Sequence, residues 1–160
     1  MSPSTKTLLI IVAALLGIAL LITGGAWYWW SRNSSDFLDA GTVAITEGDK
    51  VGRGLDESGC MAAAFERHKA DGSRGISTAV RNSLWLMACL DASKVKDKFC
   101  DGIPAQDKLL AVGTWAGMTC VRQGFPDPYC GTLLGVVPKY CSSAQRVEKL
   151  KAGGTSRPAG

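Results

Sequence analysis

Six cysteines are the residues of this chain whose spacing points most directly to a chemistry. No two of them are separated by two residues, so neither a thioredoxin-like redox motif nor a common zinc-binding pattern occurs. An even number of cysteines in a small domain is best explained by disulfide bonds formed in an oxidising compartment. We therefore expect disulfides, with no metal and no cofactor, among Cys60, Cys89, Cys100, Cys120, Cys130 and Cys141.

The only histidine, His68, is the one conventional candidate for a general base. Neither a nucleophile nor an orienting acid can be assigned to it from the sequence. A lone histidine at the end of an amphipathic helix is usually a capping or half-buried residue. The sequence therefore favours a protein that is not an enzyme, with a small envelope hydrolase using His68 as an alternative.

Two amphipathic helices are predicted to position the first cysteine pair. One should run over residues 56–70 and the other over 77–93, with Gly72 ending the first. The second helix has so wide an apolar face that it should be central and buried. Cys60 and Cys89 lie almost symmetrically about the short loop, which predicts a bridge between them. The inner side of the first helix should hold Cys60, Met61, Ala64, Phe65 and His68.

A second helical hairpin is predicted from Pro104 onward. Pro104 can occupy the first turn of a helix that ends near Gln123 with Gly124 as its cap, and Pro128 can begin the next helix after the Asp127 cap. Pro138 should kink or end that helix. The two inner faces are expected to be Leu109, Gly113, Ala116 and Cys120, adjoined by Leu110, Gly117 and Val121, and then Cys130, Leu133, Leu134 and Val137.

The antiparallel arrangement of this hairpin predicts the other two bridges. Cys120 and Cys130 lie at equal distance from Phe125, just below the turn, whereas Cys100 and Cys141 flank the open end. Spacing alone does not exclude other connectivities among the 15 that six cysteines allow. The competing pairing joins Cys89 to Cys100 and Cys60 to Cys141.

The N-terminal part of the chain is predicted to be a transmembrane signal-anchor helix. Residues 8–30 contain no charged residue and are long enough to cross the roughly 30 Å core of a bilayer. A cleaved signal peptide, with Gly24 and Ala26 before the cut, is the rival interpretation. Cleavage there would leave a cluster of aromatic residues at the N-terminus of a soluble chain, which is unfavourable, so we favour the uncleaved anchor.

Two groups of residues in this span have predicted roles. Ala13, Gly17 and Gly24 fall near one helical face, where small residues would let another transmembrane helix approach closely. Aromatic rings with a polar edge favour the boundary between membrane and water. The residues expected at that interface are Trp27, Tyr28, Trp29 and Trp30.

The remaining chain organises around one small domain. We expect a short cytoplasmic N-terminus (1–7), a juxtamembrane linker with at most a short ordered piece (31–54), a disulfide-bonded helical domain (55–142) and a flexible basic tail (143–160). The predicted fold class is all-α, a small disulfide-stapled bundle of about four helices in two hairpins. The net charge of +4 is modest and does not form a nucleic-acid footprint.

These features predict a non-enzymatic, single-pass membrane protein whose domain lies outside the cytoplasm, most simply in a bacterial periplasm. Its partners should be the membrane bilayer and a second protein, as in an accessory subunit of an envelope assembly, and not nucleic acid. The layout of cysteines and helices from Trp85 to Cys141 is similar to that of small disulfide-bonded immunity proteins that neutralise cell-wall hydrolases. An inhibitor or immunity protein against an exported enzyme is therefore an alternative.

Overall fold

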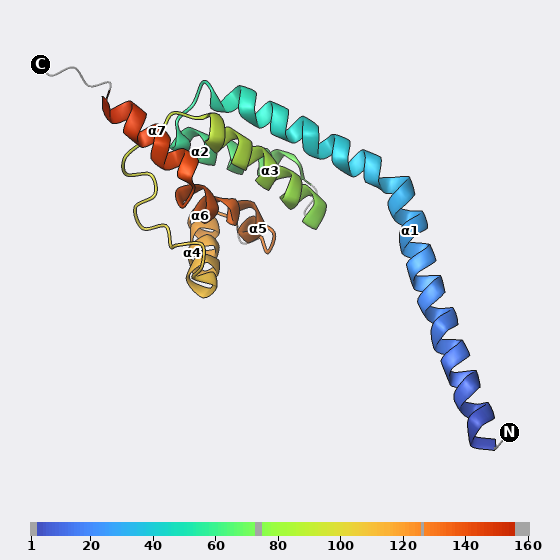
Figure 1. Ribbon diagram of the computed structural model, residues 1–160. Helices are drawn as coiled ribbons and strands as arrows, with labels where there is room; N and C mark the ends of the chain where they lie inside the picture. Colours follow the sequence, from blue (N-terminus) through green and yellow to red (C-terminus); the bar gives the residue numbers. More distant parts are fainter. Residues whose placement is uncertain (1–2, 73–74, 126, 156–160) are drawn as a thin grey trace, which may run out of the picture. The chain divides into compact units, whose positions relative to one another are not determined.

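The computed structural model of this chain is all-α, as the sequence predicted (Figure 1). It describes residues 3–72, 75–125 and 127–155, with side chains over 10–152 apart from 33–37 and the two gaps. The described residues form seven helices. The chain divides into two compact units, residues 1–39 and 40–160.

Helix α1 spans Pro3–Gly52 and contains the predicted transmembrane segment. Its stretch Ile10–Arg32 has a mean hydropathy of 2.3 over 23 residues and is long and apolar enough to cross a membrane. The sequence placed the span at 8–30, which overlaps this stretch closely. The first two residues of the predicted N-terminal segment 1–7 lie outside the described residues.

The prediction of a mostly irregular linker over 31–54 is wrong, because α1 remains helical as far as Gly52. The described hydroxyls of Ser31 and Thr46 do not compete with the helix. Each donates to a carbonyl oxygen one turn earlier in α1, at 2.9 Å. Residues 53–56 alone make the turn into the next helix.

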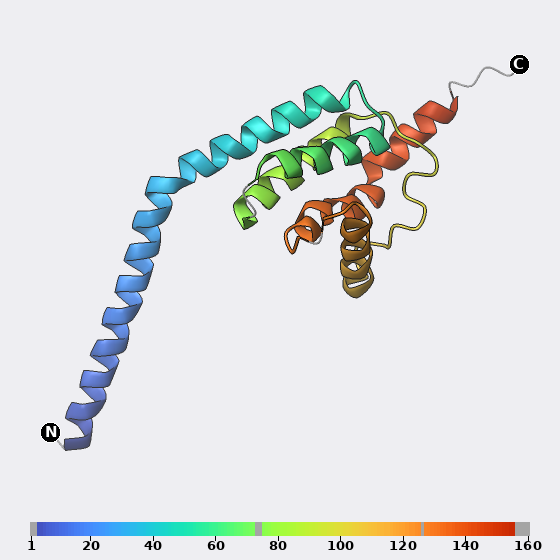
Figure 2. The same cartoon turned by 180° about the vertical axis from the view of Figure 1, so that it is seen from behind.

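The last part of α1 packs closely on α3 (Ile76–Ala92) because two glycines lie between them (Figure 2). A Cβ atom at Gly48 would collide with the carbonyl oxygen of Trp85, and one at Gly52 with that of Cys89. Ala44, one turn before Gly48, is fully buried. Glycines that look like loop residues in the sequence are therefore packing residues of a helix.

Helix α2 (Glu57–Ala70) and α3 form the first predicted hairpin. Asp56 caps α2, since its carboxylate accepts a 2.7 Å hydrogen bond from the Gly59 amide. The buried positions of α2 differ from the expected set in two respects: Met61 is half-buried, and Glu57 is fully buried. On α3 the buried apolar stripe is Ala79, Trp85, Leu86, Cys89 and Leu90.

A polar chain ties α1, α2 and α3 together at one end of this hairpin. Asp71 accepts hydrogen bonds from Arg81 (3.1 Å) and Asn82 (3.0 Å), and Asn82 in turn accepts one from Arg67 (3.1 Å). Arg67 also pairs with Glu47 of α1 at 2.9 Å. Burial opposes ionisation of Asp71, but the hydrogen bonds from Asn82 and Arg81 outweigh it and lower the pKa of this carboxyl.

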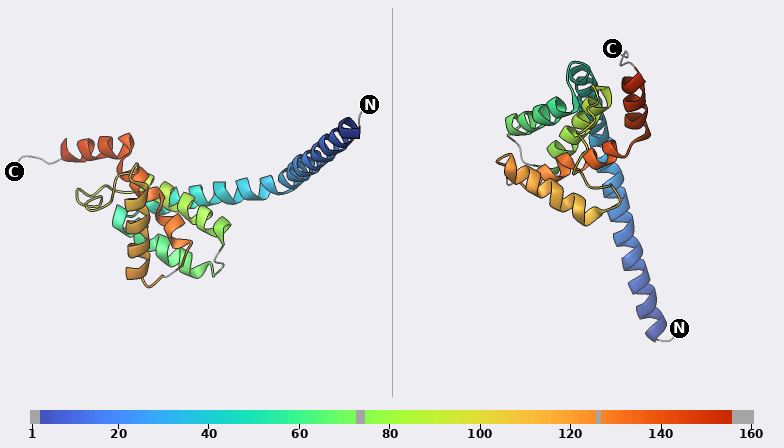
Figure 3. Two further views of the ribbon diagram at one scale, coloured as in Figure 1. Left: turned by 90° about the horizontal axis from the view of Figure 1, so that it is seen from below. Right: turned by 90° about the vertical axis from the view of Figure 1, so that its left-hand side faces the viewer.

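The second hairpin is predicted correctly in outline, but its first helix starts later than expected. Helix α4 spans Leu109–Arg122 and starts after Pro104, because residues 99–108 form successive turns instead. Gly124 ends α4 with φ +76°, and its amide and that of Phe125 bond back into the last turn. The long loop from α3 to α4 is the extended yellow trace in Figure 3.

The return arm of this hairpin is two short helices, α5 (Cys130–Leu134) and α6 (Val136–Cys141), which meet at Gly135. The expected kink before Tyr140 is present, but it lies at Gly135, and the helix then continues through Pro138 to Cys141 instead of ending. Pro138 lies in the first turn of α6, where a missing amide hydrogen costs no intrahelical bond. The Asp127 carboxylate accepts a 2.9 Å hydrogen bond from the Tyr129 amide just before α5.

The prediction of a flexible tail over residues 143–160 is also wrong for most of that length. Residues Ala144–Thr155 form helix α7, whose first turn is joined to Ser143 through a 3.2 Å hydrogen bond from the Arg146 amide. The last part of the predicted tail, residues 156–160, lies outside the described residues. The charges of this segment predict a solvated basic tail, whereas Arg146 is buried in the domain.

Candidate functional site

Three disulfides hold residues 55–142 together, and they are the pairs predicted from the sequence. Cys60–Cys89 joins α2 to α3, Cys120–Cys130 closes the turn between α4 and α5, and Cys100–Cys141 attaches the long loop to α6. All six sulfur atoms are used, so no thiol is left for catalysis or metal binding. Within the described residues, no group of three or more His, Cys, Asp or Glu side chains is placed to hold a metal ion.

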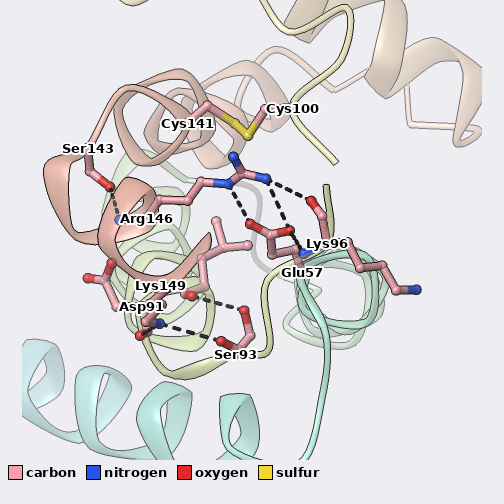
Figure 4. Close-up of polar contacts among 10 residues, drawn as sticks. Glu57, Asp91, Ser93, Lys96, Cys100, Cys141, Ser143, Arg146 and Lys149 are labelled. Atoms are coloured by element: carbon pink, nitrogen blue, oxygen red, sulfur yellow. Dashed lines mark hydrogen bonds and ion pairs between the residues drawn. A yellow bond between two sulfur atoms is a disulfide. The ribbon is translucent and has the colours of Figure 1, made fainter. Parts of the chain in front are cut away.

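A buried ion pair between Arg146 and Glu57 joins α7 to α2 (Figure 4). The Arg146 Nε donates to Glu57 Oε1 at 2.7 Å, and the side chains are 7% and 0% exposed. Arg146 also donates to the carbonyl oxygen of Lys96 at 2.8 Å, while the Lys96 amide donates to Glu57 at 2.7 Å. Every charge here has a partner, which is what a structural junction requires.

Two further groups around this junction have shifted pKa values. Burial, followed by the negative charge of Glu57, raises the pKa of the Tyr140 hydroxyl well above its usual range. Burial raises the pKa of Asp91 despite the opposing charges of Lys149 and Lys139. Both shifts follow from burial of these side chains in the packed domain.

His68, the histidine singled out in the sequence, lies in a second buried pair. Its Nε2 is 2.9 Å from Asp127 Oδ2, and the side chains are 3% and 6% exposed. The ring also packs near Phe125, with centroids 6.2 Å apart. The pair joins the last turn of α2 to the loop between α4 and α5.

This pair resembles the orienting part of a catalytic triad but lacks the rest of one. A nucleophile would have to bond the other ring nitrogen, and in the described part of the chain His68 Nδ1 is buried without a hydrogen-bond partner. Both side chains are almost fully enclosed, and Asp127 is reached only from the groove beside α4 that it helps to line. The arrangement suits a structural link between α2 and the loop that follows α4.

Helix α4 presents an apolar surface to solvent, which we call the α4 face and define as Leu110, Ala111, Thr114, Gly117, Met118 and Val121. Only Ala116 and Cys120 of its 14 residues are buried. Leu110 is 90% exposed, Val121 66% and Met118 60%. The Thr114 hydroxyl donates to the Leu110 carbonyl at 2.9 Å, so it too offers no free donor. The solvent side of a surface helix is normally polar, so this face is unusual.

A groove of about 440 Å³ lies next to the α4 face. Its lining is apolar except for Asp127, whose carboxylate is already bonded to His68 and the Tyr129 amide. The groove and the face together form a surface that could receive apolar side chains of a partner. The lining residues are Gly113, Gly117, Cys120, Val121, Phe125, Asp127, Pro128 and Gly131.

The sequence did not locate this surface. It placed Leu109, Leu110 and Val121 on the inner side of the hairpin, and this is wrong, since all three are exposed. The helix is apolar on nearly all sides, so periodicity could not say which stripe faces the core. The available signal was the absence of any charged residue between Lys108 and Arg122.

The residues predicted to act in the membrane lie on the exposed surface of α1. Ala13, Gly17 and Gly24 are exposed, and a Cβ atom at either glycine would meet nothing within 4 Å. Their role in packing against another span stays a prediction.

The aromatic cluster Trp27, Tyr28, Trp29 and Trp30 is also exposed, over 56–76% of each residue. Arg32 follows it, with its guanidinium 5.5 Å from the centre of the Tyr28 ring. Aromatic rings followed by a cation suit the membrane interface, and their position there likewise stays a prediction.

Comparison of the chain with protein-family models, with curated proteins and with solved structures gives no significant match.

Proposed function

We propose that this chain is a non-enzymatic, single-pass membrane protein whose disulfide-bonded helical domain lies outside the cytoplasm and binds another protein through the α4 face. The observation that carries the proposal is the exposure of Leu110, Met118 and Val121 on a helix held firmly by a disulfide at Cys120. Apolar surface of this kind is covered in the working state of most proteins.

The location outside the cytoplasm is supported by the three disulfides, which persist in oxidising compartments. The anchor is supported by the apolar stretch Ile10–Arg32. Alkylation of native membranes before and after reduction tests both together. We expect six protected thiols in the membrane fraction, and free thiols would contradict the location.

Binding is tested by a photo-cross-linking amino acid placed at Leu110 in the full-length chain in native membranes. We expect a discrete protein adduct at this position. The matched control is the same amino acid at Glu66, whose side chain is 72% exposed on α2 and is not part of the α4 face. Absence of an adduct at Leu110, or equal adducts at both positions, would contradict binding through the α4 face.

The identity of the adduct also separates the proposal from its main alternative. If the partner is an exported enzyme whose activity falls when the domain binds, the chain is an inhibitor or immunity protein. If the partner is a subunit of a membrane complex, the chain is an accessory subunit of an envelope assembly.

A further inference from the structure

We propose that the partner covering the α4 face is a second copy of this chain, with the two α4 helices packed antiparallel. This inference rests on the protein-binding function proposed above and names its partner. It is carried by the spacing and size of the residues on α4.

The α4 face has the spacing of a helix–helix seam. Leu110, Thr114, Gly117 and Val121 follow one another at intervals of four, three and four residues. This alternation places side chains along one line where two helices meet, as in a coiled coil. All four residues are exposed in the single chain, so nothing within the described domain already covers the seam.

The sizes of the side chains along the seam suit a second copy of α4 that runs in the opposite direction. In that arrangement Leu110 comes level with Val121 of the second copy, and Thr114 with Gly117 of the second copy. The large residues then meet at the two ends and the small ones in the middle. A Cβ atom at Gly117 would meet nothing within 4 Å, so a second helix can approach closely there.

The glycine argues against a lipid surface as the occupant. Membrane binding of an amphipathic helix grows with the apolar area inserted, and Gly117 adds none while weakening the helix. A partner helix instead gains from glycine, because its backbone can come closer. The face therefore suits a protein helix better than a bilayer.

Membrane anchoring makes such self-association more effective. Copies held by the stretch Ile10–Arg32 share one plane, which raises their effective concentration. A two-fold axis makes the same surface patch meet itself, so one face is enough for a closed dimer.

The test is the dimer dissociation constant of the full-length chain in detergent micelles, measured by sedimentation. Gly117→Leu places a bulky side chain at the close approach, and we expect it to raise this constant at least about tenfold. Because leucine favours a helix more than glycine does, the variant should melt no lower than the natural chain. Glu66→Leu adds the same side chain on α2 and should leave the constant unchanged.

The span itself can associate, so Gly17→Leu is measured in parallel to separate its contribution from that of α4. A photo-cross-linker at Leu110 then reports direction: an adduct at or near Val121 of the second copy supports the antiparallel pair. An adduct at Leu110 of the second copy would overturn that direction, and a lipid adduct would overturn the proposal.

A dimer as tight with Gly117→Leu as without it would also overturn the proposal. If the natural chain is monomeric while Leu110 still cross-links to a different protein, the second copy is the wrong partner and the protein-binding function stands. If there is neither self-association nor any protein adduct, both proposals are wrong.

Discussion

Arg146, near the start of α7, donates a 2.7 Å hydrogen bond to Glu57, the first residue of α2, although 89 positions separate them in the chain. This contact joins the first and last helices that follow α1. The carbonyl of Lys96 accepts from the same guanidinium, and the Lys96 amide donates to the same carboxylate. The backbone of Lys96, in the long loop between α3 and α4, is thereby bonded to both members of the ion pair.

Replacing Arg146 with methionine should lower the free energy of unfolding by about 3–5 kcal/mol, because Glu57 would remain buried without its counter-charge. The double variant Glu57→Leu/Arg146→Met should recover part of this loss, because no charge then stays buried. Urea denaturation of the solubilised full-length chain, followed by circular dichroism, measures both.

The control for this prediction is Arg53→Met, which breaks an exposed pair with Asp49. Exposed pairs contribute little, so the free energy of unfolding should change by less than about 0.5 kcal/mol. A similar loss for Arg53→Met and Arg146→Met would contradict the structural importance of the buried pair.

Gly48→Ala should destabilise the domain by about 1–3 kcal/mol, because the added methyl group would force α1 away from the Trp85 carbonyl. Gly41→Ala in the same helix is the matched control. Its Cβ atom would lie 3.6 Å from Leu84, an ordinary contact, so the gain in helix propensity should leave stability equal or higher. Thermal unfolding of the two variants should shift in opposite directions.

The contribution of a disulfide to the free energy of unfolding should increase with the length of the loop that it closes. Removing Cys100–Cys141, with a separation of 41 residues, should cost about 4 kcal/mol in the chain-entropy estimate. Removing Cys120–Cys130, with a separation of 10, should cost about 3 kcal/mol. Paired alanine variants compared by urea denaturation test this order, and the reverse order would show that native contacts, not loop length, dominate.

Asp71 should make stability depend on pH in the acid range. Its pKa is lowered in the folded chain, so its contribution is present above the ordinary value of 3.8 and is lost as pH falls through the folded value. Asp71→Asn should therefore cost about 1 kcal/mol at pH 7, and less at pH 3. Urea denaturation at both pH values checks this, with the exposed Asp101→Asn as a control that should change little.

The sequence alone determined the parts of the fold that depend on local signals and on pairs close to a turn. Cys60 and Cys89 lie on neighbouring helices of one hairpin, and Cys120 and Cys130 flank another turn, so symmetry about each turn favoured the bridges that the structure shows. The Asp56 cap and the Gly124 stop were predictable because each acts on residues within one helical turn.

Only the tertiary structure decided which face of each helix is buried and which polar residues belong to the core. Leu110 and Val121 look like core residues and are exposed, because α4 is apolar on nearly every side and its orientation depends on what it packs against. Arg146 looks like part of a solvated tail and is buried, because its partner Glu57 is distant in the chain. Local patterns carry no information about such long-range pairings, and the α4 face became visible only once the helices were packed together.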